Sequence, residues 1–421
     1  MKKLMALILT TLLLLTMGSA LAEPVELSFV MWDEAQKPTI QENVDAFNEM
    51  HQDSIHVTIE LVPWSDYWIK LDASLGTSQA ADVMWMNAYV TKYQPYDLLL
   101  PLNEFIDAES FDLTQYPEGN LNAFKIGENY YCLPKGMDTV FVALNTEIFD
   151  RYGVEVPTAP WTWDDMREIA SQLRDAISET GGSEYPIVME LDAQPSWQNF
   201  MTQNGGYRIS TDARTVGVGL PESIDAVQQM VDLMANGQMA SYEVLSETKG
   251  TDLFISGKAA IVFIGSWKAS VLENSSLGQE GYISLIEMPS MNDNNTCVLG
   301  GLGYAISATT EHPAEAWEFV KYITGFEAMK HEAENGIDIP CQVEAQAYYS
   351  SGFQYLKNAN VITDVSATGW PSPNNGNFEY ATPINDAVAL ALSGMAPVEE
   401  TLLAAQEEAQ AILDEYFAEM E

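Results

Sequence analysis

Aromatic rings, carboxylates and an amide stand directly behind two predicted strands near the start of the chain. Trp32, Asp33 and Glu34 follow the first strand, and Asn87 and Tyr89 follow the third. In open α/β sheets, ligands bind beyond the carboxyl ends of the strands. A flat ring covers an apolar ligand face, whereas carboxylates and amides hydrogen-bond to hydroxyl groups. This combination suits a solute with apolar faces and a rim of hydroxyls, such as a sugar ring.

Trp267 occupies the same kind of position farther along the chain. The apolar run from Ala259 to Ile264 predicts a buried strand, and Gly265-Ser266 predicts a turn that sends the next side chain out of the sheet. Most aromatic side chains in a sequence with 10 Trp and 19 Tyr fill the core or its rim. Only aromatics at strand ends and in the adjoining loops are therefore candidates for ligand contact, and Trp267 is the foremost of them.

The elements that must position these residues begin with a β-α-β unit. Apolar residues alternate with polar or smaller ones over residues 27–31 and 55–61, which predicts two strands. Between them, the apolar residues of the segment 40–47 fall on one helical face. A strand, a helix and a second strand predict a parallel sheet, to which residues 82–86 add a third strand.

The second half of the chain follows the same scheme. Residues 140–145, 259–264 and 283–286 predict further strands, and Thr162-Trp163-Asp164-Asp165 is typical of a capping box that opens a helix. The apolar stripe over residues 402–416 predicts an amphipathic helix at the C-terminus. The fold class is therefore α/β, and a length of 421 residues predicts about two domains.

Charge and composition narrow the range of partners. The formal net charge is −43, which disfavours nucleic acid and anionic surfaces as partners because phosphate groups would be repelled. Hydrophobic residues make up 47% of the chain and aromatic residues 10%, so the acidic chain can still bury a large core. The sequence predicts a folded protein that binds no nucleic acid.

The first 22 residues are typical of a secretory signal peptide. Lys2 and Lys3 precede an apolar run over residues 4–15, and the small residues of Ser19-Ala20-Leu21-Ala22 predict cleavage before Glu23. The apolar run is too short for the roughly 20 residues that span a bilayer. No cysteine lies near the cleavage site, so the sequence predicts an exported protein without a lipid anchor, in the periplasm or in the extracellular space of the cell envelope.

The sequence does not contain the enzyme and metal-site motifs that its carboxylates, histidines and cysteines could suggest. The adjacent carboxylates of Asp33 and Glu34 point apart at a strand end, whereas a glycosidase needs two carboxyl groups that converge on one bond. His331-Glu332 lacks the second histidine of a zinc protease motif, and the sequence contains neither a G-x-S-x-G elbow nor a P-loop. The three cysteines are widely separated and are interpreted as small buried hydrophobes; they are Cys132, Cys297 and Cys341. The sequence predicts no enzyme, no cofactor and no metal.

A series of short strings resembles the extracellular solute-binding proteins of family 1, the maltose-binding-protein-like sugar receptors. The strings, in the family's order, are Met31-Trp32-Asp33, Ala81-Asp82-Val83, Leu100-Pro101-Leu102-Asn103, Gly127-Glu128-Asn129-Tyr130-Tyr131-Cys132-Leu133-Pro134, Ala143-Leu144-Asn145, Phe254-Ile255-Ser256-Gly257-Lys258, Gly265-Ser266-Trp267 and His312-Pro313-Ala314-Glu315-Ala316-Trp317. Each string alone is weak, but their order and spacing together identify the fold. The proline and threonine that start a helix in the family match Pro160 and Thr162 only with Trp161 inserted.

The resemblance implies two α/β lobes joined by three crossings of the chain, near residues 132–135, 300–303 and 337–341. Behind the signal peptide, the first lobe would comprise residues 23–132 and 303–338. The second lobe would comprise residues 133–302 and 339–421. The resemblance also implies a monomeric receptor that captures a mono- or oligosaccharide between the lobes and delivers it to the permease of an ABC importer.

Further site residues follow from this arrangement. Asp138, just past the first crossing, is a candidate acceptor in the cleft, and Gly301 is expected to let backbone amides approach the ligand. The family places an aromatic platform near the last crossing, where this chain departs in sequence and offers Trp370, Phe378 and Tyr380 as alternatives. The remaining aromatic candidates, each with a packing role as the alternative, are Trp197, Trp370 and Tyr380.

A cationic solute is the main alternative to a sugar. Acidic residues with aromatic walls would also suit a polyamine. A metal ion would need clustered His, Cys or Tyr ligands, which the sequence does not place together. A secreted carbohydrate-active enzyme is a more distant alternative, and the identity and length of the sugar are left open by the sequence.

Overall fold

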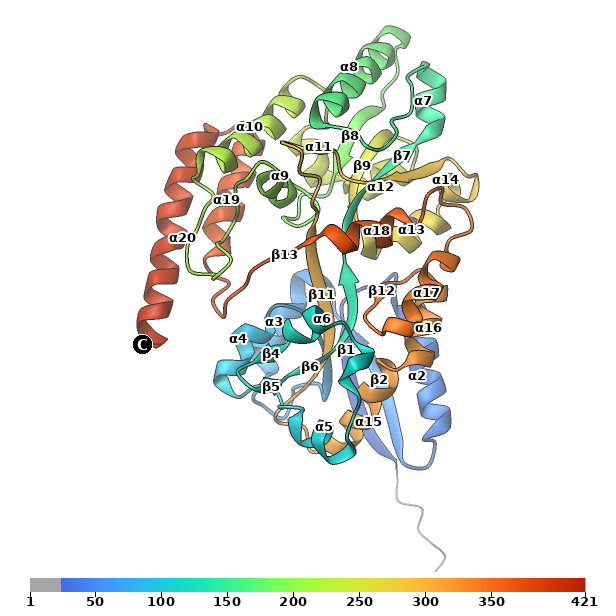
Figure 1. The fold of residues 1–421 in the computed structure, drawn as a ribbon, viewed down its shortest axis with the longest axis vertical. Helices are drawn as coiled ribbons and strands as arrows, with labels where there is room; N and C mark the ends of the chain where they lie inside the picture. The colour runs from blue at the N-terminus through green and yellow to red at the C-terminus, as the bar shows by residue number, and fades with distance from the viewer. Residues whose placement is uncertain (1–23, 421) are drawn as a thin grey trace, which may run out of the picture.

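A computed structural model describes the chain from Pro24 to Met420, and these residues form two α/β lobes stacked along the long axis of the molecule (Figure 1). The proposed signal peptide lies outside the described residues. Each lobe contains a sheet flanked by helices, so the predicted two-lobed architecture is confirmed. No helix among residues 24–420 is long and apolar enough to cross a membrane.

The sheet of the first lobe has the strand order β12-β6-β11-β3-β1-β2, and β13 pairs with the first residues of β11. Its strands are β1 (Val25–Met31), β2 (Ile55–Leu61), β3 (Val83–Met86), β6 (Cys132–Asp138), β11 (Val298–Ile306), β12 (Ile339–Pro340) and β13 (Trp370–Pro371). A separate hairpin is formed by β4 (Lys125–Ile126) and β5 (Asn129–Tyr130).

The prediction of a parallel sheet is correct only for part of this lobe. β1 pairs in parallel with both β2 and β3, as the β-α-β pattern requires. β11, however, lies antiparallel to both β3 and β6, and the sheet is therefore mixed. The reason is that β11 enters this sheet from the second lobe and runs through it in the opposite direction.

Helices cover both faces of this sheet, and their apolar sides form one hydrophobic core with it. The helices of this half of the molecule are α2 (Lys37–Met50), α3 (Trp64–Ser74), α4 (Val90–Tyr93), α5 (Asn103–Glu109), α6 (Glu118–Asn122), α15 (Pro313–Ile323), α16 (Phe326–Glu334) and α17 (Gln346–Tyr349). The predicted stripe on α2 is buried at Ile40, Val44 and Phe47, which confirms the helix between the first two strands.

The sheet of the second lobe has the order β10-β7-β9-β8. Its strands are β7 (Val140–Asn145), β8 (Tyr185–Met189), β9 (Ala259–Gly265) and β10 (Ile283–Ile286). Every residue of β7 and β9 is buried, which explains why both read as continuous apolar runs in the sequence. The strands predicted over residues 140–145, 259–264 and 283–286 are thus confirmed.

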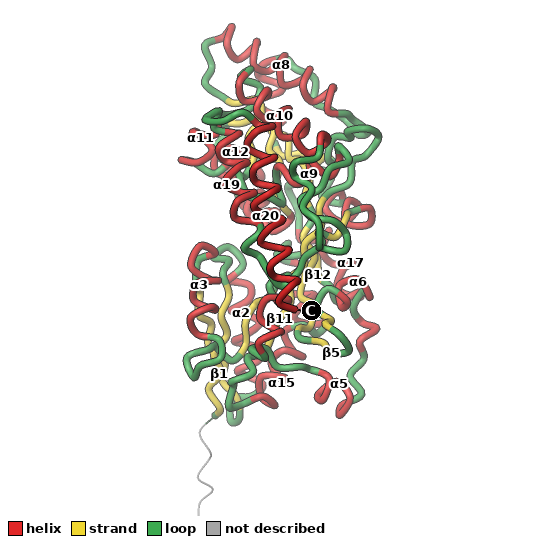
Figure 2. Tube along the Cα trace, turned by 90° about the vertical axis from the view of Figure 1, so that its left-hand side faces the viewer, coloured by secondary structure: helices red, strands yellow, loops and turns green. Residues whose placement is uncertain are grey.

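The helices around this second sheet are α7 (Thr146–Tyr152), α8 (Trp163–Thr180), α9 (Trp197–Gln203), α10 (Pro221–Ala235), α11 (Tyr242–Glu247), α12 (Gly250–Ile255), α13 (Ala269–Asn274), α14 (Ser276–Gln279), α18 (Val361–Asp364), α19 (Ala381–Leu392) and α20 (Val398–Met420). The capping box at the start of α8 is confirmed, since Thr162 and Asp165 bond reciprocally. Figures 1 and 2 show α20 alongside the second lobe, with its C-terminal end directed towards the first lobe.

The two lobes are joined by strands that continue from one into the other. β6 ends at Asp138 and β7 begins at Val140, so a single residue, Thr139, separates a strand of the first sheet from a strand of the second. β11 packs against the second core at Leu299 and reaches the first core at Leu302. The division into a first lobe of residues 23–132 and 303–338 and a second lobe of residues 133–302 and 339–421 stays a prediction.

The three cysteines, Cys132, Cys297 and Cys341, are free and buried.

Candidate functional site

The carboxyl ends of β1, β2 and β3 carry a cluster of aromatic rings on the first lobe. Trp32 follows β1 and contacts four rings, with centroid distances of 4.8 Å to Tyr67, 5.0 Å to Trp85, 5.2 Å to Trp64 and 5.7 Å to Trp68. Three of these contacts are edge-to-face, which is a favoured geometry for aromatic pairs. Trp32 is thus half-buried at the sheet edge, where the sequence predicts a ligand contact.

Asp33 faces the second lobe. Its Oδ1 atom accepts hydrogen bonds from the backbone N–H groups of Ala35, at 2.8 Å, and Gln36, at 3.1 Å. Its Oδ2 atom lies 3.9 Å from Nζ of Lys268, which follows β9 in the second lobe. The neighbouring Glu34 is exposed. The backbone bonds hold one oxygen of Asp33, and the other oxygen remains directed at a cation across the lobe boundary.

Asn87 and Tyr89 follow β3, as predicted. Asn87 Oδ1 accepts a hydrogen bond from the backbone N–H of Tyr89, at 3.0 Å, which turns the chain beyond the strand. The Tyr89 ring stacks on Trp68 and on Phe378, with both centroid distances 4.0 Å and interplanar angles of 13° and 12°. Two rings this close cannot share one face without overlapping, so they lie on opposite faces of Tyr89.

Trp267 lies in a 3-10 turn, η3 (Ser266–Lys268), directly after β9. A Cβ atom placed on Gly265 would fall on its six-membered ring, so glycine at this position lets the ring fold back over the strand end. Thr139 N donates to Ser266 Oγ at 3.1 Å, and Ser266 N donates to Thr139 O at 2.9 Å. These bonds place the half-buried Trp267 next to the joint between β6 and β7.

Asp138 is the last residue of β6, and its carboxyl group and the side-chain amide of Gln194 both lie beside Gly300. A Cβ atom on Gly300 would lie 3.0 Å from Gln194 Nε2 and 3.1 Å from Asp138 Oδ2. Removal from water raises the pKa of the Asp138 carboxyl to about 8, and the nearby Asp338 carboxylate adds to the rise. The raised pKa favours the protonated form of Asp138, which donates a hydrogen bond as well as accepting one.

Gly301 has a more open environment than its neighbour. A Cβ atom placed on it would find one atom within 4 Å, the carbonyl oxygen of Gly136, at 3.9 Å. The close approaches in this strand are thus at Gly300 and Gly303, and the sequence analysis selected neither as a site residue. The role of Gly301 stays a prediction.

The remaining aromatic candidates are dispersed. Trp197, at the start of α9, is 2% exposed and belongs to the core of the second lobe. Trp370 is half-buried in β13, where it pairs with Val298 of β11. Tyr380 is 1% exposed, and the guanidinium of Arg208 lies 5.8 Å from its ring centroid. Because both side chains are buried, Trp197 and Tyr380 have a packing role, which is the alternative that the sequence analysis gave for them. Contact of either residue with a ligand stays a prediction.

A buried ionic cluster lies where β6 meets α16 and the residue before β12, and sequence reasoning missed it. Lys135 Nζ lies 2.9 Å from Asp338 Oδ2, 3.0 Å from Glu332 Oε2 and 3.2 Å from Gln36 Oε1. The Lys135 side chain is 0% exposed. The two carboxylates keep the pKa of Lys135 above its ordinary value despite burial, while burial raises the pKa values of Glu332 and Asp338. An ammonium shared between two carboxylates therefore ties β6 to α16 and β12.

The other functional candidates that the sequence did not single out are Lys268, Gln194 and Arg208. Each is brought to its partner by tertiary structure. The position of Lys268, directly after Trp267 at a strand end, is a signal that the sequence offered. For Gln194 and Arg208 no motif exists, because their partners come from distant segments.

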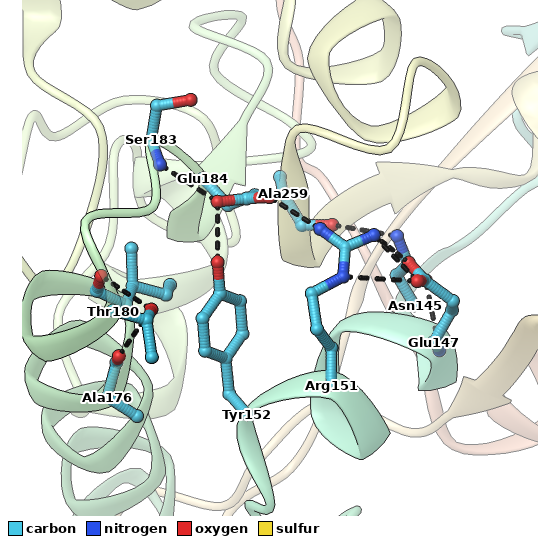
Figure 3. A network of polar contacts seen from close by, with 10 residues as sticks. Asn145, Glu147, Arg151, Tyr152, Ala176, Thr180, Ser183, Glu184 and Ala259 are labelled. Atoms are coloured by element: carbon cyan, nitrogen blue, oxygen red, sulfur yellow. Dashed lines mark hydrogen bonds and ion pairs between the residues drawn. The ribbon is translucent and has the colours of Figure 1, made fainter.

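A second charged network, drawn in Figure 3, lies within the second lobe. Arg151 of α7 lies between Glu147 and Glu184, with N–O distances of 2.6 Å to each. Tyr152 donates to Glu184 at 2.8 Å. Each acidic group in this network has a direct partner within the second lobe, so the network stabilises α7 against β8. Within residues 24–420, no group of three or more His, Cys, Asp or Glu residues is placed to hold a metal ion.

Comparisons with known proteins agree with this architecture. A structure of an ABC substrate-binding protein from Listeria monocytogenes in complex with cycloalternan matches with a TM-score of 0.85 and 20% identity, over 93% of this chain and 100% of that chain. The GacH receptor of Streptomyces glaucescens, solved unliganded and with acarbose, matches with a TM-score of 0.83 and 18% identity, over 93% and 99% of the two chains. At this identity, the likeness shows the fold.

Sequence relatives give a similar picture. The erythritol/L-threitol-binding protein of Mycolicibacterium smegmatis is 24% identical over 67% of this chain and 63% of its own length. The multiple sugar-binding protein of Streptococcus mutans is 25% identical over 50% of each chain. The matches thus span about half to two thirds of these relatives. The family model of the bacterial extracellular solute-binding proteins matches residues 32–330, and this chain belongs to that family.

Proposed function

We propose that this protein is an exported, non-enzymatic receptor that captures a carbohydrate between its lobes and delivers it to the permease of an ABC importer. The observation that carries the proposal is the arrangement at the lobe boundary. Asp33, which follows Trp32 on the first lobe, lies 3.9 Å from Lys268, which follows Trp267 on the second. Each lobe thus brings an aromatic ring and a hydrogen-bonding group to the boundary, and a sugar ring needs both kinds of group.

Local charge favours a neutral ligand over a polyamine. Lys268 places a positive charge 3.9 Å from Asp33, and the raised pKa of Asp138 disfavours its negatively charged form. A polyamine would need uncompensated carboxylates at these positions. A hydroxyl-rich solute gains from both groups, because Lys268 and protonated Asp138 donate hydrogen bonds and Asp33 accepts them. The names of the relatives point the same way, since they are binding proteins for polyols and sugars.

Isothermal titration calorimetry tests the ligand class directly. The purified protein is titrated with a panel of sugar alcohols, monosaccharides and malto-oligosaccharides, and separately with putrescine and spermidine. The proposal expects saturable binding of at least one carbohydrate and none of the polyamines. Saturable binding of a polyamine alone, or release of a shortened sugar during incubation, would replace the proposal with a polyamine receptor or an enzyme.

The compartment and assembly are part of the proposal. The mature chain begins near Glu23, carries no lipid anchor and acts as a monomer, which N-terminal sequencing of exported material and light scattering would test. A membrane-retained product with residues 1–22 still attached is the outcome that contradicts cleavage. The proposed first lobe, residues 23–132 with 303–338, moves against the second on closure, and the sugar stabilises the closed state by contacting both.

A further inference from the structure

The segment between β13 and α19 reaches from the second lobe to the first. Phe378 of this segment stacks on Tyr89, which follows β3 of the first lobe, at a centroid distance of 4.0 Å and an angle of 12°. Trp68 covers the opposite face of Tyr89 with nearly the same geometry. Three rings from separate parts of the chain therefore form one stack, and both faces of Tyr89 are occupied by the protein itself.

A second set of contacts fixes the same segment between the lobes. Thr91 Oγ1 of α4 donates a hydrogen bond to the backbone oxygen of Asn375 at 2.7 Å. Asn375 is 9% exposed, and its Nδ2 atom donates to the backbone oxygen of Ala213 in the second lobe at 2.7 Å. The peptide of Asn375 thus bonds to the first lobe while its side chain bonds to the second.

The close fit of this segment requires glycine at position 376. A Cβ atom there would lie 2.6 Å from the backbone oxygen of Thr91 and would also clash with the hydroxyl of Tyr416 on α20. Any larger side chain would force α4 and α20 apart. The segment is therefore shaped to both lobes at once, which a loop packed on one lobe would not need.

We propose that residues 374–378 form an interlobe latch, in which Phe378 acts as a positioning residue that holds Tyr89 and α4 against the second lobe. The latch stabilises the closed arrangement through contacts within the protein. Tyr89 is the residue on the first lobe that Phe378 contacts. While this contact is made, the Tyr89 ring offers no stacking face to a ligand. The existence of the latch depends on these contacts alone, whereas its effect on affinity rests on the proposed sugar-binding function.

The latch has a measurable consequence without any ligand. Aromatic pairs are worth roughly 0.5–1.5 kcal/mol beyond the area they bury, which corresponds to about a two- to tenfold change in an equilibrium constant. Phe378→Ala should therefore lower the ratio of closed to open protein by about two- to tenfold. Phe378→Tyr keeps a flat ring and should restore the ratio.

The experiment measures the distance between the lobes in the ligand-free protein. Spin labels on Met50→Cys and Met395→Cys, at positions that are 60% and 78% exposed on the first and second lobes, report the open and closed populations by pulsed electron resonance. Phe105→Ala is the matched control, because Phe105 stacks on Trp317 within the first lobe only. We expect a larger population of long distances for Phe378→Ala, and unchanged distances for Phe378→Tyr and Phe105→Ala.

Two outcomes would overturn the latch. One is an unchanged distance distribution in Phe378→Ala, and the other is a shift of equal size in Phe105→Ala. Neither depends on knowing the ligand, so failure of the latch is distinct from failure of sugar binding. Once a ligand is identified, Phe378→Ala should weaken its affinity by no more than the factor by which closure is weakened. A much larger loss would show that Phe378 contacts the ligand directly and would replace the latch with a contact role.

Discussion

Two ionic groups lie where the lobes meet, and they differ in how completely their charges are paired. In the first group, Lys135 is 0% exposed and lies within 3.0 Å of both Glu332 and Asp338. In the second group, at the lobe boundary, Lys268 and Asp33 are partly exposed and 3.9 Å apart. A buried charge must be paired because its desolvation is costly, whereas a charge near water can remain available. The comparison teaches that the first group belongs to the folded structure and the second is free to serve a ligand.

The largest expected effect follows from breaking the buried group. Lys135→Ala leaves Glu332 and Asp338 buried without their shared cation, which should lower the free energy of unfolding by about 3–5 kcal/mol. Urea unfolding followed by circular dichroism measures it. The matched control is Lys92→Ala, which removes an exposed pair with Asp72 and should cost less than about 1 kcal/mol. Equal losses in the two variants would show that the buried group has no special structural role.

Asp138 lies between the two groups and should make stability depend on pH. Its pKa is raised to about 8 in the folded protein and is about 4 when unfolded, so between these values the folded state binds more protons. Stability therefore falls as pH rises from about 4 to 8, by at most about 1.4 kcal/mol for each pH unit. Asp138→Asn cannot titrate, and its unfolding free energy should vary less over this range. Parallel pH profiles for the two proteins would contradict the raised pKa.

A substitution at Trp267 tests the lobe boundary without changing the buried cluster of Lys135, Glu332 and Asp338. Trp267→Ala removes an aromatic platform that is worth roughly 0.5–1.5 kcal/mol in addition to about 25 cal/mol for each Å² that a ligand buries on it. At least a tenfold loss of affinity is expected, since about 1.4 kcal/mol corresponds to that factor. Calorimetry with the identified ligand measures the affinity, and Trp317→Phe in the first core is the control that should retain it. A severe loss of melting temperature with unchanged affinity would make Trp267 a packing residue.

The smallest effect on stability is expected for the pair of Asp33 and Lys268 at the lobe boundary. A double-mutant cycle with Asp33→Asn and Lys268→Met should give a coupling energy below about 1 kcal/mol for stability, because the two charges are partly exposed and at the distance limit of an ion pair. The same single variants should weaken ligand binding if both groups hydrogen-bond to the ligand. A coupling of several kcal/mol in stability would remove the contrast between the two regions.

The sequence predicted the local elements well because their signals are local. The apolar runs that became β7 and β9, the stripe on α2 and the capping box at Thr162 depend on residues a few positions apart. The same reasoning placed Asp33 and Trp267 at strand ends, where the structure has them. The mixed direction of the first sheet was missed, since the path of β11 depends on where the chain returns from the second lobe.

The sequence by itself thus determined the alternation of strands and helices, the two-lobed class and the aromatic and acidic residues at the strand ends. Only the tertiary structure decided which side chains meet: Lys135 with Glu332, Asp33 with Lys268, and Tyr89 with Phe378. The physical reason is that each of these pairs joins segments far apart in the chain. No periodicity or spacing encodes such contacts, which form only when whole sheets and lobes pack together.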